Sequence, residues 1–157
     1  VDLIQPIEGV FHLLGQQLRV HNIEVELEIP ENLPPVWGEA NRFEQVFINL
    51  VMNARDAIEE RRLSNGDLQG HIKVSAAQEG DRIEITISDN GAGIPKDLTE
   101  RIFEPFFTTK EVGKGTGLGL SISYGIVRDS GGAIEVTSNL GHGASFNLSF
   151  PVAQEER

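Results

Sequence analysis

Two asparagines four positions apart are the first residues whose type and spacing could do chemistry. Asn49 and Asn53 lie in segment 41–58, where apolar residues recur at helical spacing. Side chains four apart project from one face of a helix, and an amide oxygen is a neutral ligand that Mg²⁺ accepts beside waters and phosphate oxygens. Taken alone, the pair is more simply interpreted as two hydrogen-bonded asparagines at a helix margin.

A sheltered carboxylate follows a predicted strand. Counting by twos from Ile83 places Asp89 on the same face as the strand's isoleucines, and segment 89–94 then reads DNGAGI. Gly91 and Gly93 permit positive φ and close approach of a ligand to the backbone. Asp89 could therefore accept a hydrogen bond from an exocyclic amine such as that of adenine. The commoner interpretation of such letters is a turn, but a turn aspartate usually points to water.

A glycine-rich segment precedes a predicted helix. Residues 113–121 read GKGTGLGLS, and backbone N–H groups from such a run can converge on an anion at a helix N-terminus. The spacing fits neither a Walker A loop nor a dinucleotide fingerprint. Lys110 and Lys114 are either phosphate ligands or solvated loop lysines. Three phenylalanines around Pro105 favour core or lid packing.

Hydrophobic periodicity predicts the elements that position these groups. Helices are expected over 2–20, from about Asn41, and over 121–130 with Ile122 and Ile126 inward. Asn41 and Glu44 have capping-box spacing. Strands are expected around residues 25–29, 72–76, 83–89, 134–136 and 146–150, with loops over 61–70 and 91–119, the second carrying short helical pieces. A loop as long as 91–119 is typical of a lid or of disorder.

Composition narrows the class of protein. The 157 residues carry 13 Lys and Arg against 24 Asp and Glu, a net charge of −11, which argues against a nucleic-acid or anionic-membrane surface. The length suits one domain, and the lack of cysteine excludes disulfides and thiolate sites. No apolar run reaches the roughly 18 residues of a membrane span. The four histidines have no metal-ligand spacing, so structural or exposed positions are expected.

The order of these motifs resembles a known family. Segments 49–54 (NLVMNA), 89–94 (DNGAGI), 102–107 (IFEPFF) and 115–121 (GTGLGLS) resemble the N, G1, F and G2 boxes of sensor histidine kinase catalytic domains, in the GHKL superfamily. Segment 141–146 (GHGASF) is similar to that family's last glycine segment. The resemblance implies the Bergerat fold: a two-layer α/β (α+β) sandwich, with a mixed sheet packed against helices and a mobile ATP lid.

The resemblance also implies roles for individual residues. It makes Asn53 the Mg²⁺ ligand, Asn49 its polar neighbour, Asp89 the acceptor for the adenine amine, and Ser145 the hydroxyl where the family commonly has Thr. Asn49, Asn53 and Lys110 are the expected catalytic residues. The remaining expected contacts to ATP are Asp56, Gly91, Gly93, Ile94, Phe107, Thr108, Thr109, Lys110, Lys114, Gly115, Thr116, Gly117, Leu118, Gly119 and Leu120.

Position 49 separates the possible activities. Hydrolysing relatives of the gyrase, Hsp90 and MutL type carry a Glu there, and an amide cannot accept a proton from water at neutral pH. The sequence therefore favours a kinase that transfers the γ-phosphoryl group of Mg-ATP to a histidine. Three alternatives stay open: an ATP hydrolase, a non-enzymatic nucleotide sensor, and a serine kinase of the anti-sigma type.

The acceptor histidine is expected on another domain. His12 precedes Leu13 and His21 precedes Asn22, so neither has the acidic neighbour usual for a phosphoacceptor. We interpret residues 1–153 as the catalytic and ATP-binding domain, with a frayed tail over 154–157 and no dimerisation domain. The implied partners are the histidine-containing dimerisation domain of the same kinase and, indirectly, a response regulator. The domain is expected in the cytoplasm without membrane contact, and the parent's membrane association stays open.

Overall fold

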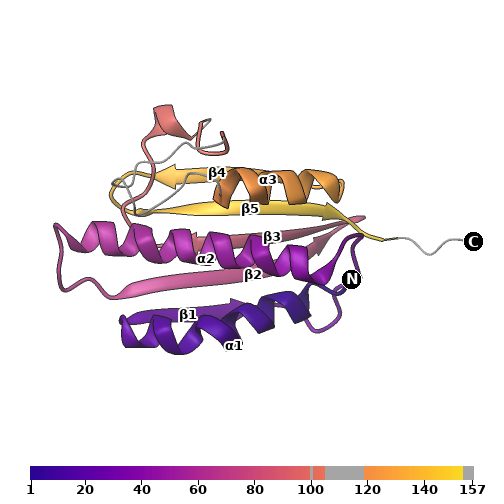
Figure 1. Ribbon diagram of the computed structural model, residues 1–157, viewed down its shortest axis with the longest axis horizontal. Helices are drawn as coiled ribbons and strands as arrows, with labels where there is room; N and C mark the ends of the chain where they lie inside the picture. The colour runs from indigo at the N-terminus through magenta and orange to yellow at the C-terminus, as the bar shows by residue number, and fades with distance from the viewer. Residues whose placement is uncertain (100, 105–118, 154–157) are drawn as a thin grey trace, which may run out of the picture.

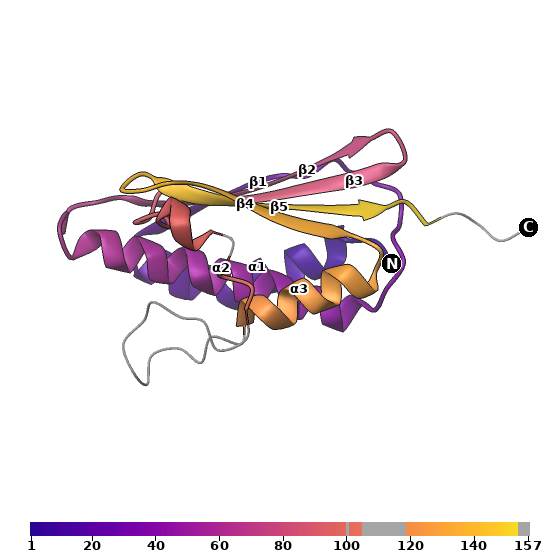
Figure 2. The ribbon, with the colours of Figure 1, turned by 90° about the horizontal axis from the view of Figure 1, so that it is seen from above.

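The described residues form a two-layer sandwich of one sheet and three α-helices. The computed structural model describes residues 1–99, 101–104 and 119–153. Figure 2 shows the layers edge-on, with all three helices on one face of the sheet. In chain order the elements are α1 (Ile4–Val20), β1 (Ile23–Glu28), α2 (Ala40–Arg62), β2 (Gly70–Glu79), β3 (Arg82–Asp89), the 3₁₀ turn η1 (Lys96–Leu98), α3 (Gly119–Asp129), β4 (Ala133–Asn139) and β5 (Gly143–Pro151).

The sheet is mixed, as predicted. Its strand order is β1-β2-β3-β5-β4, and only the β1–β2 pair among these strands is parallel. A parallel pair needs a crossover, and α2 supplies it between β1 and β2 (Figure 1). The crossover lays α2 across the inner face of the sheet (Figure 2), and Ala57 near the end of the helix contacts the loop that follows β3.

The core lies between the sheet and the helices. Strand alternation sends Ile83, Ile85 and Ile87 inward, where each is buried, and α2 contributes the predicted apolar stripe. Phe43 of α2 meets Phe150 of β5 edge to face, with ring centroids 5.4 Å apart. Asp89 occupies the next inward position after Ile87.

The predicted capping box of α2 is wrong. The helix begins at Ala40 with Glu39 as its N-cap, no side chain caps it, and Asn41 lies inside the first turn. The predicted loop over 61–70 is also shorter, because α2 continues to Arg62. The Arg62 guanidinium donates to the carbonyls of His21, Asn22 and Leu68, and these bonds hold the last turn of the helix.

The phase of α3 differs from the prediction. Its buried residues are Ser123, Ile126 and Val127, whereas Ile122 is 40% exposed. Position 123 precedes Ile126 by three residues and Val127 by four, so it lies one turn earlier on the stripe that these two residues define. A serine therefore occupies the inward position that we had predicted for Ile122.

The two ends of the described chain meet at one segment. Val36 exchanges backbone hydrogen bonds with Val1 and forms a β-bridge with Val152. The amide of Val152 also donates to the carbonyl of Asp81, just before β3 begins. Asp89 ends the same strand, so the chain ends and Asp89 lie at opposite ends of β3 (Figure 1). Among the described residues, no helix is long and apolar enough to span a membrane.

Candidate functional site

The polar row of α2 faces the start of α3. Asn49 Nδ2 donates to the Gly119 carbonyl and to Ser123 Oγ, both at 3.2 Å. One turn further, Asn53 is half-buried and makes no hydrogen bond to a described residue. Asp56, also half-buried, pairs with the Arg55 guanidinium at 3.2 Å. The two asparagines thus lie one turn apart on the same face, as predicted. Asn49 is hydrogen-bonded to α3, whereas Asn53 makes no hydrogen bond to a described residue.

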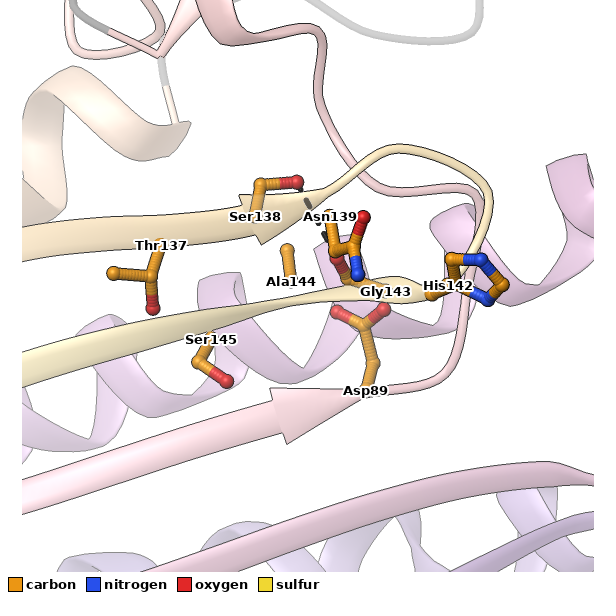
Figure 3. Close-up of a pocket in the computed structure, with 8 residues that line it drawn as sticks. All are labelled: Asp89, Thr137, Ser138, Asn139, His142, Gly143, Ala144 and Ser145. Carbon is orange, nitrogen blue, oxygen red and sulfur yellow. Dashed lines mark hydrogen bonds between the residues drawn. The ribbon is translucent and has the colours of Figure 1, made fainter.

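Asp89 lies at the end of β3 on the isoleucine face. Figure 3 shows its carboxylate pointing towards β5, and one of its oxygens accepts the Gly91 amide at 2.8 Å. Burial raises its pKa from 3.8 to about 6, against the opposing effect of the Gly91 and Ala144 amides. Asp89 therefore caps a turn and also keeps the inward direction that the residue count predicted.

The loop after Asp89 is fixed between α2 and the β4–β5 turn. The amide of Ala92 donates to the Ala57 carbonyl at 2.9 Å, and a Cβ on Gly91 would stand 2.5 Å from the carbonyl carbon of Ala57. On the other side, Gly93 adopts a φ of +75°, and the Ile94 amide donates to Ser138 Oγ at 2.6 Å. Gly91 is thus required by its close approach to Ala57 and Gly93 by its positive φ, whereas their contact with a ligand stays a prediction.

Ser145 does not stand beside the Asp89 carboxylate. It pairs with Ser88 across the β3–β5 ladder, and their hydroxyl oxygens are 2.8 Å apart. Successive side chains of a strand leave opposite faces, so Ser145 shares the face of Ser88 and not that of Asp89. Buried Ala144 occupies the neighbouring position on the inner face. The role of Ser145 near the adenine stays a prediction, and both Ser145 and Asp89 line the hollow at the β4–β5 turn.

A shallow hollow of 360 Å³ opens at the β4–β5 turn. Figure 3 shows the strands of this hollow standing in front of α2. Neither Asn49 nor Asn53 lines it, so the hollow is separate from the polar row of α2. Its lining residues are Asp89, Thr137, Ser138, Asn139, His142, Gly143, Ala144 and Ser145.

Two predicted ATP contacts of the glycine-rich segment, Gly119 and Leu120, are among the described residues. Gly119 begins α3, and its carbonyl accepts from Asn49, while Leu120 is partly buried and packs against the core. Their contact with the nucleotide stays a prediction. Phe103 packs against Tyr124 and Phe146, with ring centroids 5.4 and 6.3 Å away, which confirms its packing role. The other predicted contacts lie outside the described residues: Phe107, Thr108, Thr109, Lys110, Lys114, Gly115, Thr116, Gly117 and Leu118.

The donor set suits a magnesium ion shared with phosphate. Within the described ranges no three His, Cys, Asp or Glu side chains gather to hold a metal, and all four histidines are exposed. Mg²⁺ usually keeps several waters and takes few protein ligands beside substrate phosphates. The uncommitted amide of Asn53 fits that requirement.

Three residues important to this arrangement were missed in the sequence. Ala57 extends the Asn49–Asn53 row by another four residues, a signal that was present in the spacing. Ser123 was missed because the predicted phase of α3 turned Ile122 towards the core in its place. The Ser138 hydroxyl accepts from the Ile94 amide and donates to the Gly143 carbonyl, and its bond to Ile94 has no local sequence signal because the two residues are distant in the chain.

This fold and site define a nucleotide-binding α/β domain, with a helical polar row on one side and a strand-end carboxylate on the other. The chain belongs to the family of histidine kinase-, DNA gyrase B- and HSP90-like ATPases, whose sequence profile matches residues 38–154.

Similar proteins are sensor kinases. The chain is 48% identical over 155 residues to the two-component sensor PprA of Pseudomonas aeruginosa, covering 97% of the chain and 16% of PprA. It is 42% identical over 165 residues to the sensor kinase CckA of Brucella abortus, covering 100% of the chain and 17% of CckA. The chain therefore spans less than a fifth of the length of these relatives.

Solved structures agree with the fold. The nucleotide-free catalytic domain of histidine kinase ThkA matches with a TM-score of 0.81 at 33% identity, over 97% of this chain and 93% of that one. ThkA in complex with the response regulator TrrA matches with a TM-score of 0.78, over 100% and 42%. The predicted sensor-kinase type of catalytic and ATP-binding domain is confirmed, together with its α/β sandwich.

Proposed function

We propose that the chain binds Mg-ATP and transfers its γ-phosphoryl group to a histidine on the dimerisation domain of the same kinase. The observation that supports the proposal best is the hydrogen bonding of the Asn49 amide to α3. The Asn49 side chain is an amide, and its NH₂ group donates hydrogen bonds to α3. An amide is not basic at neutral pH, so Asn49 cannot take a proton from an attacking water. A site without a general base at this position suits transfer to an acceptor that is already nucleophilic.

We assign the adenine to Asp89. Its buried carboxylate would accept the exocyclic amine, while Gly91 and Gly93 let the loop backbone approach the ring. The Gly91 amide already fixes the carboxylate, so the acceptor is positioned before the ligand arrives. The amides at the start of α3 would receive phosphate oxygens at the positive end of the helix.

We assign Mg²⁺ to Asn53, with Asn49 Oδ1 beside it. A bound Mg²⁺ would neutralise charge on the phosphate oxygens. The residues of the chain then position the γ-phosphorus for the acceptor imidazole, whose ring nitrogen forms the N–P bond as the bond to the β,γ-bridging oxygen breaks and ADP leaves. Positioning and charge neutralisation supply most of the catalysis in phosphoryl transfer.

Further parts of the proposal concern the parent protein. We propose residues 1–153 as the functional unit, a cytoplasmic setting, and onward transfer from the phosphohistidine to a response regulator. The complex between ThkA and TrrA supports the last of these for a protein of the same family.

The deciding experiment mixes this chain with labelled ATP and a candidate dimerisation domain. We expect an acid-labile, base-stable phosphohistidine on the added domain, and no label when its histidine is replaced. Steady ADP release without labelling would favour an ATP hydrolase instead. Binding with neither release nor labelling would favour a nucleotide sensor.

Replacement Asn53→Ala tests the metal assignment. The variant should lose most of the Mg²⁺-dependent gain in ATP affinity, because the uncommitted amide oxygen is gone, while metal-free binding through the adenine persists. Calorimetry with and without Mg²⁺ measures both. Asn65→Ala, in the exposed segment after α2, is the matched control. An unchanged Mg²⁺ dependence in Asn53→Ala would contradict the assignment.

A further inference from the structure

Ser123 is a buried polar residue at the contact between α2 and α3. Its exposure is 0%, and among the described residues it is the buried position that is polar rather than apolar. Its hydroxyl oxygen accepts from Asn49 Nδ2 at 3.2 Å. A buried hydroxyl with a single distant side-chain partner indicates that the position serves this contact, since an apolar residue would pack the helix equally well.

The contact fixes the orientation of the Asn49 amide. The Gly119 carbonyl can only accept a hydrogen bond, so the amide nitrogen of Asn49 must face it. Ser123 provides a second acceptor for the same NH₂ group. The nitrogen is therefore committed to α3, and no described residue donates to Asn49 Oδ1.

We propose that Ser123 is a positioning residue for nucleotide binding. It holds the Asn49 amide in one orientation and thereby holds the first turn of α3 against α2. This inference rests on the proposed function, because it matters only if the triphosphate lies between the start of α3 and the Asn49–Asn53 row. A carboxylate at position 49 would have no proton to donate to the Gly119 carbonyl, so it could keep only the contact with the Ser123 hydroxyl.

The experiment compares the affinity for Mg-ATP with the affinity for adenosine. Adenosine uses the Asp89 end of the site and lacks the phosphates. Ser123→Ala should weaken Mg-ATP binding roughly fivefold to tenfold, the size of one buried hydrogen bond, and leave adenosine binding unchanged. Ser130→Ala, which removes a hydroxyl bonded to the Ile126 carbonyl just after α3, is the matched control and should change neither affinity.

A double-mutant cycle tests whether Ser123 acts through Asn49. In an Asn49→Ala background, Ser123→Ala should cause no further loss of Mg-ATP affinity. Full additivity of the two losses would overturn the proposal. Equal weakening of adenosine and Mg-ATP by Ser123→Ala would also overturn it, because that result indicates a general packing defect.

The outcomes separate this inference from the proposed function. Failure of the unchanged chain to bind Mg-ATP or to phosphorylate an acceptor histidine contradicts the proposed function. Normal binding and transfer by the unchanged chain, with no effect of Ser123→Ala on Mg-ATP affinity, contradicts only the positioning role. Thermal unfolding of each variant, followed by circular dichroism, identifies variants that do not fold, and Ser123→Cys, which keeps the size of the side chain but replaces the hydroxyl by a weak acceptor, then serves as the second variant.

Discussion

Burial of the Asp89 carboxylate destabilises the folded protein at the position where the ligand is expected. Its carboxylate is held away from water with a pKa of about 6, well above the ordinary 3.8. Between these values the folded protein binds more protons than the unfolded chain, so this group makes the free energy of unfolding fall as pH rises from about 4 to about 7. Above that range the folded protein carries the full cost of a buried charge.

Replacement Asp89→Asn should abolish nucleotide binding and leave the fold intact. At pH 8 the gain from removing a desolvated charge is offset in part by the loss of an acceptor for the Ala144 amide, so we expect the free energy of unfolding to rise by less than about 2 kcal/mol, measured by urea denaturation. In the variant, the backbone amide of Gly91 donates to the only side-chain oxygen of the asparagine at position 89. The side-chain NH₂ group then faces the exocyclic amine of adenine, and two donors cannot form a hydrogen bond. Unchanged adenosine affinity in calorimetry would remove the adenine role.

The same residue predicts a pH dependence of binding. In the unchanged chain, adenosine affinity should fall as pH drops through about 6, because the protonated carboxyl is a weaker acceptor.

Single residues were predictable where they follow an element's own period. Asp89 was placed correctly because it continues the alternation of Ile83, Ile85 and Ile87. The pairing of Ser145 with Ser88 was not predictable from the sequence, because it depends on the register between β3 and β5. Ser123 was missed because Ile122 and Ile126 fit a helical stripe equally well in the sequence.

At the scale of elements, α2 and the loop after β3 form one unit through direct backbone contact. Gly91 lies against the backbone of Ala57, and the Ala92 amide bonds to the carbonyl of the same residue. The helix that carries Asn53 thus also sets the position of the loop that follows Asp89. The two halves of the candidate site cannot shift independently.

Replacement Gly91→Ala should break this unit. The new Cβ would stand 2.5 Å from a backbone carbon of Ala57, so the loop must move. We expect a loss of about 2 kcal/mol in the free energy of unfolding and a clear loss of adenosine affinity.

Gly15→Ala is the matched control. Gly15 lies within α1 with nothing within 4 Å of its added Cβ, so alanine there should stabilise the helix by about 1 kcal/mol and leave adenosine affinity unchanged. Normal adenosine affinity in Gly91→Ala would show that the contact with Ala57 does not position the loop.

Element types were largely predictable, and element boundaries were less so. Amphipathic period alone identified the three helices and the five strands, although β1 buries only Ile23 and leaves the predicted inward residue Leu27 41% exposed. The start of α2 was misjudged because Asn41 and Glu44 have capping spacing, whereas backbone bonds to the Glu39 carbonyl start the helix. The end of α2 depends on Arg62 reaching carbonyls some 40 residues away in the chain. No local pattern contains that information.

At the scale of the whole molecule, the charge of −11 makes stability depend on salt. Like charges repel across a compact surface, and raising salt from about 0.01 M to about 0.15 M shortens the screening length from about 30 Å to about 8 Å. At pH 7 the free energy of unfolding should rise on the order of 1 kcal/mol, measured with urea, an uncharged denaturant. Near the isoelectric point of 4.7 the increase should vanish. Equal salt effects at both pH values would show that screening of net charge is not the cause.

The meeting of Val1, Val36 and Val152 has a mechanical consequence. A pull between the two ends of the described chain passes through the hydrogen bonds of Val1 with Val36 and the bridge of Val36 with Val152. These bonds form a short path for the force at the end of β3 opposite to Asp89. The bond of the Val152 amide to the Asp81 carbonyl ties this path to the near end of β3, so tension at the two ends enters the sheet far from Asp89 and its ligand contacts.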